Sequence, residues 1–245
     1  ISSNHFFNVL SSSTGLIPIN FTPGAISGGN TISGNFIGGS ALNAGGAPLI
    51  VTSASSFAGI TLTVDTLNVT TLNGNTIKNI NLQNTGSHTF LGINIIDGRV
   101  NITNNMIGDS LTANSILVAG SSTTTGIRYD GTNYTNSFTI SGNTIANMNA
   151  EGTGTAVRVR GFTYDDAIGQ VTISDNAIYN LSTMSSGTGV AAGSQVAVGM
   201  HIFGDYATPP VISGNTIYNI SANNTGAFAT TSAGIMATDF GGVIN

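Results

Sequence analysis

Ionisable side chains are rare in this sequence, and one group of them could act together. The chain has 245 residues, of which 6% are Asp, Glu, Lys or Arg. The group consists of Arg128, Asp130, Arg158, Arg160, Asp165, Asp166, His201 and Asp205. Arginine can hold a carboxylate through paired hydrogen bonds, and neighbouring carboxylates can serve as general acid and base. We therefore take these eight residues as candidate ligand-binding residues.

A repeated pair, a small residue followed by an apolar one, is expected to begin the strands that position this group. Its copies are Gly15-Leu16, Gly59-Ile60, Gly92-Ile93, Gly126-Ile127, Ala156-Val157, Gly199-Met200 and Gly234-Ile235. Successive side chains of a strand point to opposite faces. Aligning the last four pairs predicts that Arg128, Arg158 and His201 form one outward column. Asp130 and Arg160 follow two residues further along, and the four apolar partners point inward: Ile127, Val157, Met200 and Ile235.

Three interpretations of this face are open. Asp130, Arg158 and Arg160 could form a surface lattice of ion pairs, or the face could bind a sugar, or it could be a catalytic site. A single Ca²⁺ at Asp165, Asp166 and Asp205 is a further alternative, because calcium takes carboxylate ligands. The sequence has no zinc-ligand spacing, so we expect no resident metal and no cofactor.

A second motif, similar to Ile-Ser-Gly-Asn, alternates with the first. Its asparagines are Asn4, Asn35, Asn75, Asn105, Asn143, Asn176 and Asn215. The interval runs from 30 residues (Asn75 to Asn105) to 40 (Asn35 to Asn75). A constant motif with variable insertions is typical of a solenoid, in which each repeat stacks on the previous one.

Each repeat reads as three short strands separated by turns. Apolar residues alternate with polar ones over short runs bounded by Gly, Asn, Ser and Thr, which favours strands over helices. The predicted fold is all-β, a right-handed parallel β-helix of about seven coils with three short strands per coil and without evident caps. We expect one domain over residues 1–245, with coils starting near Ile1, Ile32, Leu72, Ile102, Ile140, Ile173 and Ile212.

The segments ISGNTIYNI (212–220) and ISDNAIYNL (173–181) resemble the repeats of the pectate-lyase-like family of parallel β-helix proteins. The low charge and the wealth of Asn, Thr and Gly resemble long secreted surface proteins of bacteria. This resemblance covers nearly the whole chain, and it implies the fold rather than an activity. Lyases and galacturonases of this fold act on a lateral face like the one described above, so the resemblance implies a carbohydrate face there with an acidic sugar as its ligand.

Stacking of the repeats predicts columns of identical residues. Strands of neighbouring coils lie about 4.8 Å apart, so Ile145, Ile178 and Ile217 should form one inward apolar column. The seven motif asparagines should form a ladder of amide hydrogen bonds, since a buried turn needs its polar groups satisfied.

Composition excludes several classes of function. A net charge of −5 argues against a nucleic-acid partner, because no basic patch is available to neutralise phosphates. Apolar runs are shorter than the roughly 18 to 20 residues of a membrane-spanning helix. Cysteine is absent, which excludes disulfides and thiolate metal sites.

Both ends of the sequence fall within the repeat. The chain starts on the motif at residues 1–4, and its last three residues align with the opening of another copy at residues 211–213. The expected assembly interface comprises Ile1, Asn4, Phe6, Val9, Ile235, Val243 and Ile244. An unpaired strand edge is a template for further pairing.

These observations predict a structural, non-enzymatic protein. We expect a subunit of an extracellular filament or cell-surface stalk that stacks head to tail by strand pairing, with an additional adhesive role. Its partners would be further copies of itself or flanking coils of a longer chain, and glycans. The alternative is a carbohydrate-binding or polysaccharide-degrading protein, either a lyase or a glycosidase.

Overall fold

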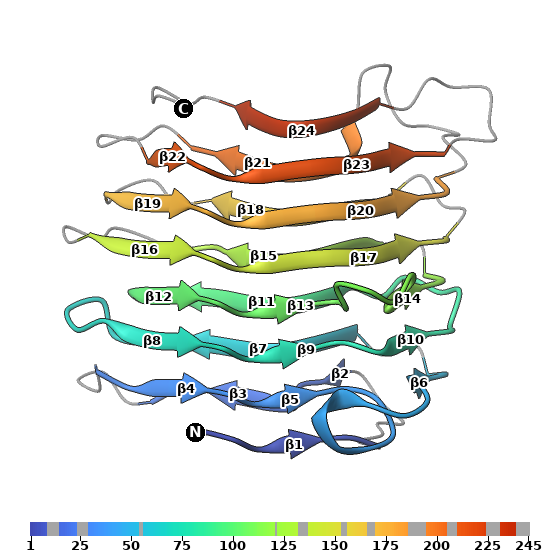
Figure 1. Ribbon diagram of the computed structural model, residues 1–245, viewed down its shortest axis with the longest axis horizontal. Coiled ribbons are helices and arrows are strands. Elements are labelled where there is room, and N and C mark those ends of the chain that lie inside the picture. The colour runs from blue at the N-terminus through green and yellow to red at the C-terminus, as the bar shows by residue number, and fades with distance from the viewer. Residues whose placement is uncertain are drawn as a thin grey trace.

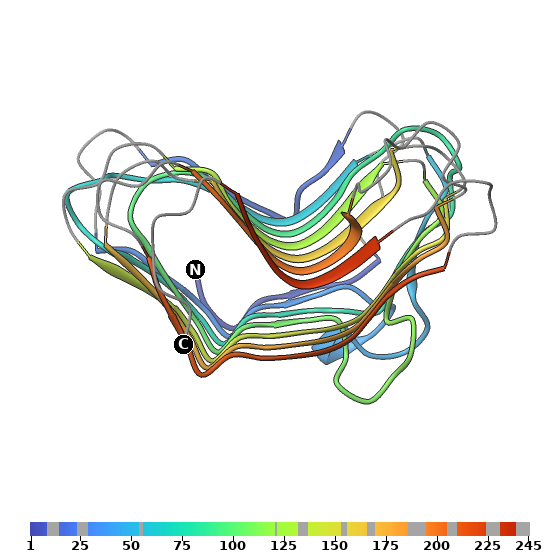
Figure 2. The same cartoon turned by 90° about the horizontal axis from the view of Figure 1, so that it is seen from above.

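The computed structural model describes residues 1–8, 15–23, 29–53, 56–120, 122–131, 137–152, 156–165, 170–185, 195–204, 210–223 and 231–238. These residues form a parallel β-solenoid with three sheets, stacked from β1 at the bottom of Figure 1 to β24 at the top. The chain turns counterclockwise as it rises toward the viewer in Figure 2, so the coil is right-handed. The fold class predicted from the sequence is confirmed.

The three sheets are each made of one strand, or one pair of short strands, per coil. The first sheet contains β4 (Thr31–Ser33), β8 (Thr70–Asn73), β12 (Val100–Thr103), β16 (Phe138–Ser141), β19 (Val171–Ser174) and β22 (Val211–Ser213). The second contains β1 (His5–Phe6), β5 (Phe36–Ile37), β6 (Leu49–Val51), β9 (Thr76–Ile77), β10 (Ile80–Leu82), β13 (Met106–Ile107), β14 (Ile116–Val118), β17 (Thr144–Ala150), β20 (Ala177–Thr183) and β23 (Thr216–Ala222). The third contains β2 (Gly15–Leu16), β3 (Ile19–Phe21), β7 (Ser56–Thr63), β11 (Phe90–Asp97), β15 (Thr123–Tyr129), β18 (Arg158–Asp165), β21 (Gln195–Phe203) and β24 (Thr231–Thr238). One 3-10 turn, η1 (Leu42–Ala44), lies between β5 and β6.

The Ile-Ser-Gly-Asn motif forms the corner between the first and second sheets. The residue before each motif asparagine has a left-handed backbone, with φ between 55° and 67°. These residues are Ser3, Gly34, Gly74, Asn104, Gly142, Asp175 and Gly214. Gly, Asn and Asp tolerate this conformation best, which explains why six of the seven corners carry one of these three residues.

The motif asparagines form the predicted ladder through all seven levels. Each backbone N–H and each Nδ2 donates to Oδ1 of the asparagine one level up, over 2.8–3.1 Å. Five levels have a ladder neighbour on both sides, and their asparagines are at most 4% exposed. The ladder therefore satisfies the polar groups of a turn that water does not reach.

Apolar columns fill the interior. Ile145 pairs in register with Ile178, and Ile178 with Ile217, as predicted. The column continues downward through Ile107, Ile77 and Ile37. The expected coil starts are also in register, from Ile32 in β4 to Ile212 in β22.

A column of glycines lets the third sheet approach the second. Gly126 faces the isoleucine column, and a Cβ on it would lie 2.5 Å from Cγ2 of Ile145 and 2.6 Å from the carbonyl oxygen of Gly161. The same contact recurs from Gly59 to Gly199. Because only a hydrogen fits here, the third sheet bends inward and its outer surface is concave (Figure 2).

Candidate functional site

The candidate ligand-binding residues lie on the concave outer surface of the third sheet. Alternation within β15 buries Ile127 and Tyr129 and leaves Arg128 exposed. In β18 the outward residues include Arg160 and Thr163, while Phe162 and Tyr164 are buried. The glycine bend between residues 160 and 162 lets both of these outward side chains face the same hollow.

The predicted outward column is wrong at β18. Arg128 pairs with Thr163, which in turn pairs with His201. Arg158 pairs instead with Thr123, and Arg160 with Thr125. The chain offers two small–apolar pairs five residues apart, and Gly161-Phe162, not Ala156-Val157, is the one aligned with Gly126-Ile127. Gly161 is required because a Cβ there would meet Ile178 at 2.4 Å.

The register gives a corrected inward set. Ile127, Phe162, Met200 and Ile235 form the inward column that was expected to contain Val157. Three aromatic side chains next to the candidate residues are therefore part of the core and not of the outer surface: Tyr129, Phe162 and Tyr164. The Tyr129 hydroxyl donates to the Gly98 carbonyl oxygen over 2.6 Å inside the coil. Phe203 remains 40% exposed on the outer surface.

The ion-pair lattice is present only in part. Arg128 Nη2 is bonded to Asp130 Oδ2. Among the residues that the structure describes, no carboxylate pairs with Arg158 or Arg160. Two of the three arginines on this surface thus have no counter-charge within the described part of the chain. Asp166 and Asp205 lie outside the described residues.

A hollow of about 280 Å³ runs over β11, β15 and β18. We call it the arginine groove, and it is lined by the hydroxyl groups of Thr89, Thr123, Thr125 and Thr163 and by Arg128 and Arg160. Asp165 also lines it. The groove therefore combines hydroxyl-bearing side chains, two arginines and one carboxyl group.

The electrostatics of the groove follow from burial and from the unpaired arginines. Burial lowers the pKa of the Arg160 guanidinium, and the charges of Arg158 and Arg128 lower it further. The same causes, burial first and then Arg160 and Arg158, lower the pKa of His201 to about 4. His201 is therefore neutral at pH 7.

Burial raises the pKa of the Asp165 carboxyl, as does Asp130 on the neighbouring strand, while Arg128 opposes them. Tyr129 and Tyr164 pair in register on neighbouring strands. The residues that follow them, Asp130 and Asp165, therefore occupy equivalent positions on adjacent coils. Within the described ranges, no cluster of three metal-ligating side chains is found. Two of the three proposed Ca²⁺ ligands are outside those ranges.

The expected assembly residues lie at the two terminal levels where they are described. Ile1 is 48% exposed and Asn4 is exposed on the lowest level, while Phe6 packs on the edge of the core. Ile235 packs on the core in the highest described level. Val9, Val243 and Ile244 lie outside the described residues.

A second asparagine ladder was not predicted. Asn219 Nδ2 donates to Asn180 Oδ1, and Asn180 Nδ2 to Asn147 Oδ1, over 3.0 and 3.1 Å. All three have a left-handed backbone, like Asn79 lower in the second sheet. The signal was available in the sequence, because each of these four asparagines follows a motif asparagine by four residues.

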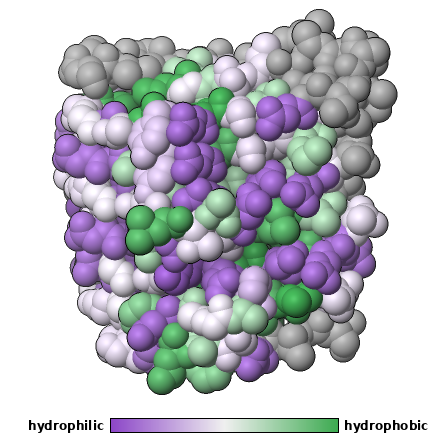
Figure 3. All heavy atoms as spheres, turned by 45° about the vertical axis from the view of Figure 1, so that its right-hand side comes forward, coloured by the Kyte–Doolittle hydropathy of each residue, from purple (hydrophilic) through white to green (hydrophobic). Residues whose placement is uncertain are grey.

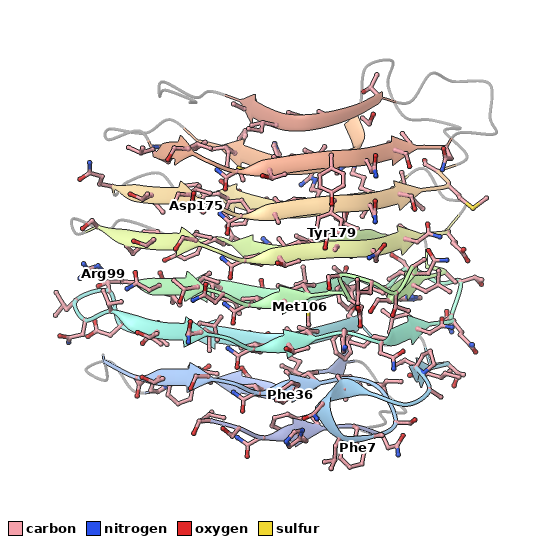
Figure 4. All side chains as sticks on the ribbon, in the orientation of Figure 1. Phe7, Phe36, Arg99, Met106, Asp175 and Tyr179 are labelled. Atoms are coloured by element: carbon pink, nitrogen blue, oxygen red, sulfur yellow. The ribbon has the colours of Figure 1, made fainter. Side chains whose placement is uncertain are left out.

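The outer surface of the second sheet carries two further features. Lys78 Nζ contacts Asp109 Oδ2 at 2.7 Å, and this pair lowers the pKa of Asp109. Tyr179 and Tyr218 stack with ring centroids 4.8 Å apart, and Figure 4 shows Tyr179 pointing outward. Figure 3 shows hydrophilic and hydrophobic residues interspersed on the side of the molecule that it displays.

The chain matches no family model, no curated protein and no solved structure. Within the described part, no helix has the length and apolar character needed to cross a membrane. The fold by itself defines the class of protein, a parallel β-solenoid with asparagine ladders.

Proposed function

We propose that this chain is a structural segment of an extracellular filament or cell-surface stalk. Coil stacks on coil by strand pairing, either head to tail between copies or onto further coils of a longer chain. In this role the protein turns over no substrate. The extracellular location is supported by the low charge and by the Asn, Thr and Gly content.

The observation that carries this proposal is the polarity of the asparagine ladder. Every bond runs upward, from N–H and Nδ2 of one level to Oδ1 of the next. Among the described residues, no donor reaches Oδ1 of Asn4 and no acceptor lies within reach of the Asn215 N–H. The two groups complement each other, so a highest level placed under a lowest level would extend the ladder without a break.

The apolar columns support the same stacking. Ile178 is fully buried between its neighbours, whereas Ile217 on the highest described level of that column is only partly buried. A further coil would bury Ile217, Ile220 and Ile235 together with the exposed strand edge. Removing apolar area and unpaired backbone groups from water favours that contact.

Sedimentation and electron microscopy test the proposal. The purified protein should form polymers at high concentration, with an axial repeat of roughly 33 Å from seven levels. Asn4→Lys places a charge at the proposed contact and should shift the polymer to monomers. Thr172→Lys, on the outer surface of the first sheet, is the matched control and should polymerise like the wild type. A wild-type protein that stays monomeric at all concentrations, or equal effects of the two lysines, would contradict the proposal.

Carbohydrate binding or cleavage at the third sheet is the second candidate function. The arginine groove supports it, because threonine hydroxyls and arginines are suited to hydroxyl-rich, acidic ligands. Asp130 is already paired with Arg128, which favours binding over acid–base cleavage. Incubation with acidic polysaccharides, followed by measurement of new reducing ends, separates the two roles.

A further inference from the structure

The arginine groove contains positive charge that nothing in the described structure neutralises. Arg160 lines the groove, and Arg158 lies beside it, paired with the lining residue Thr123. Of the arginines described on this surface, only Arg128 has a carboxylate partner. A partly buried charge is unfavourable unless an opposite charge or hydrogen bonds compensate it. In a chain with five basic and ten acidic residues, two adjacent unpaired arginines on one surface are not explained by excess positive charge.

Buried donors in the same place also lack partners. Among the described residues, no hydrogen-bond partner reaches Oγ1 of Thr163, which is only 9% exposed. Arg160 Nε and His201 Nδ1 are buried and without a partner as well. Thr163 and His201 occupy the same column on adjacent strands, and Arg160 precedes Thr163 on β18. A buried polar group without a protein partner needs a hydrogen-bond partner from water or a ligand, and here three such groups lie close to unpaired positive charge.

We propose that the arginine groove binds a singly charged oxyanion, a carboxylate or a sulfate ester, carried by a larger ligand. The guanidinium groups of Arg158 and Arg160 supply the charge, since a guanidinium matches two oxygens of one anion. The Thr163 hydroxyl donates to a further oxygen. This inference rests on the second candidate function, carbohydrate binding at the third sheet, and does not require coil stacking, because the groove lies on the lateral surface.

Carboxyl groups at the groove would disfavour more strongly charged anions. Asp165 lines the groove, and Asp130 occupies the equivalent position just after β15. A phosphate monoester with two negative charges would be repelled by these carboxylates more strongly than a carboxylate or sulfate with one. The threonine hydroxyls along the groove can bond the uncharged part of the ligand.

Three dextrans of equal length test this site: dextran sulfate, carboxymethyl dextran and neutral dextran. Binding is measured by titration calorimetry at constant ionic strength. The wild type should bind one or both of the acidic dextrans, and the arm that binds identifies the anion. Binding of all three with equal affinity, or of none, would overturn the proposal.

Variants assign the binding to the groove. Arg158→Gln/Arg160→Gln should weaken it by about tenfold or more, because charge-assisted bonds are lost. Thr163→Val keeps the charge and shape and should weaken it by about threefold to tenfold, the range for one neutral hydrogen bond. Arg99→Gln is the control. Arg99 lies between β11 and β12, donates to the backbone carbonyl oxygens of Ser137 and Leu67, and lies at the edge of the molecule in Figure 4.

The control should stay within about twofold of the wild type, because it changes only the net charge. Circular dichroism verifies that each variant is folded. Equal losses in the arginine double variant and the control would show that the acidic dextrans bind through general charge attraction, and the proposed site would then be wrong.

Discussion

Replacing Asn105 by leucine tests the structural importance of the asparagine ladder. Asn105 lies in the middle of the ladder and is 1% exposed. Its Oδ1 accepts two hydrogen bonds from Asn75, and its Nδ2 donates to the oxygens of Leu72, Thr103 and Asn143. Leucine has nearly the same shape and can form none of these five bonds.

The magnitude follows from those bonds. An intramolecular hydrogen bond contributes about 1 kcal/mol net, and a buried group left without a partner costs about 1 to 3 kcal/mol. The Asn75 N–H loses the acceptor that it has in the ladder. Because the Nδ2 bonds share two hydrogens, we expect Asn105→Leu to lower the free energy of unfolding by about 3 to 5 kcal/mol.

Urea unfolding followed by circular dichroism measures this loss. The matched control is Asn149→Leu, because Asn149 faces outward and bonds only to the Glu151 and Ser182 side chains. The control should lose about 1 kcal/mol or less. If the two leucines were equally destabilising, the ladder would contribute no more than a surface contact. Solenoids can unfold in segments. The urea concentration at the midpoint and the slope of the free energy of unfolding against urea are therefore both compared between the variants.

Three further predictions concern other parts of the coil. Gly126→Ala should lower stability by about 2 to 3 kcal/mol, since its Cβ would lie 2.5 Å from the facing isoleucine; Gly15→Ala, with its nearest atom at 3.8 Å, should change urea unfolding by less than about 0.5 kcal/mol. The His201 resonances should titrate with a pKa of about 4. Because His201 is protonated near pH 6.5 in the unfolded chain but only near pH 4 in the folded protein, the free energy of unfolding should decrease as the pH is lowered from 6.5 to 4. A pKa near 6.5 in the folded protein would contradict this. Lys78→Met should raise the pKa of Asp109 toward its ordinary value, because the ion pair lowers it, and cost about 0.5 to 1 kcal/mol above pH 4 in thermal unfolding.

The sequence predicted the fold and most of the register because the information is repeated. The Ile-Ser-Gly-Asn motif marks the position of the corner at each level, because it contains a residue with a left-handed backbone followed by a ladder asparagine. Any alignment that matches these corners also aligns the first and second sheets. The asparagines four residues further on carry the same information for the second ladder, and they were overlooked because a single Asn has many alternative roles in turns.

The arrangement of the candidate site was less predictable. In the sequence alone, Ala156-Val157 and Gly161-Phe162 match the strand motif equally well. The choice between them is made by Ile178 on the opposite sheet, which leaves no room for a Cβ at position 161. Shifting β18 by five residues separates Arg158 from Arg128, so which arginine finds a carboxylate could be decided only in three dimensions.

The inward bend of the third sheet has a mechanical consequence. Because the same close glycine contact recurs from Gly59 to Gly199, the cross-section keeps its bent shape along the axis (Figure 2). A beam with a bent profile resists flexing better than a flat ribbon of equal mass, since its material lies further from the neutral plane. A stalk built from such coils would resist bending under shear, and its concave side would form one continuous groove along its length.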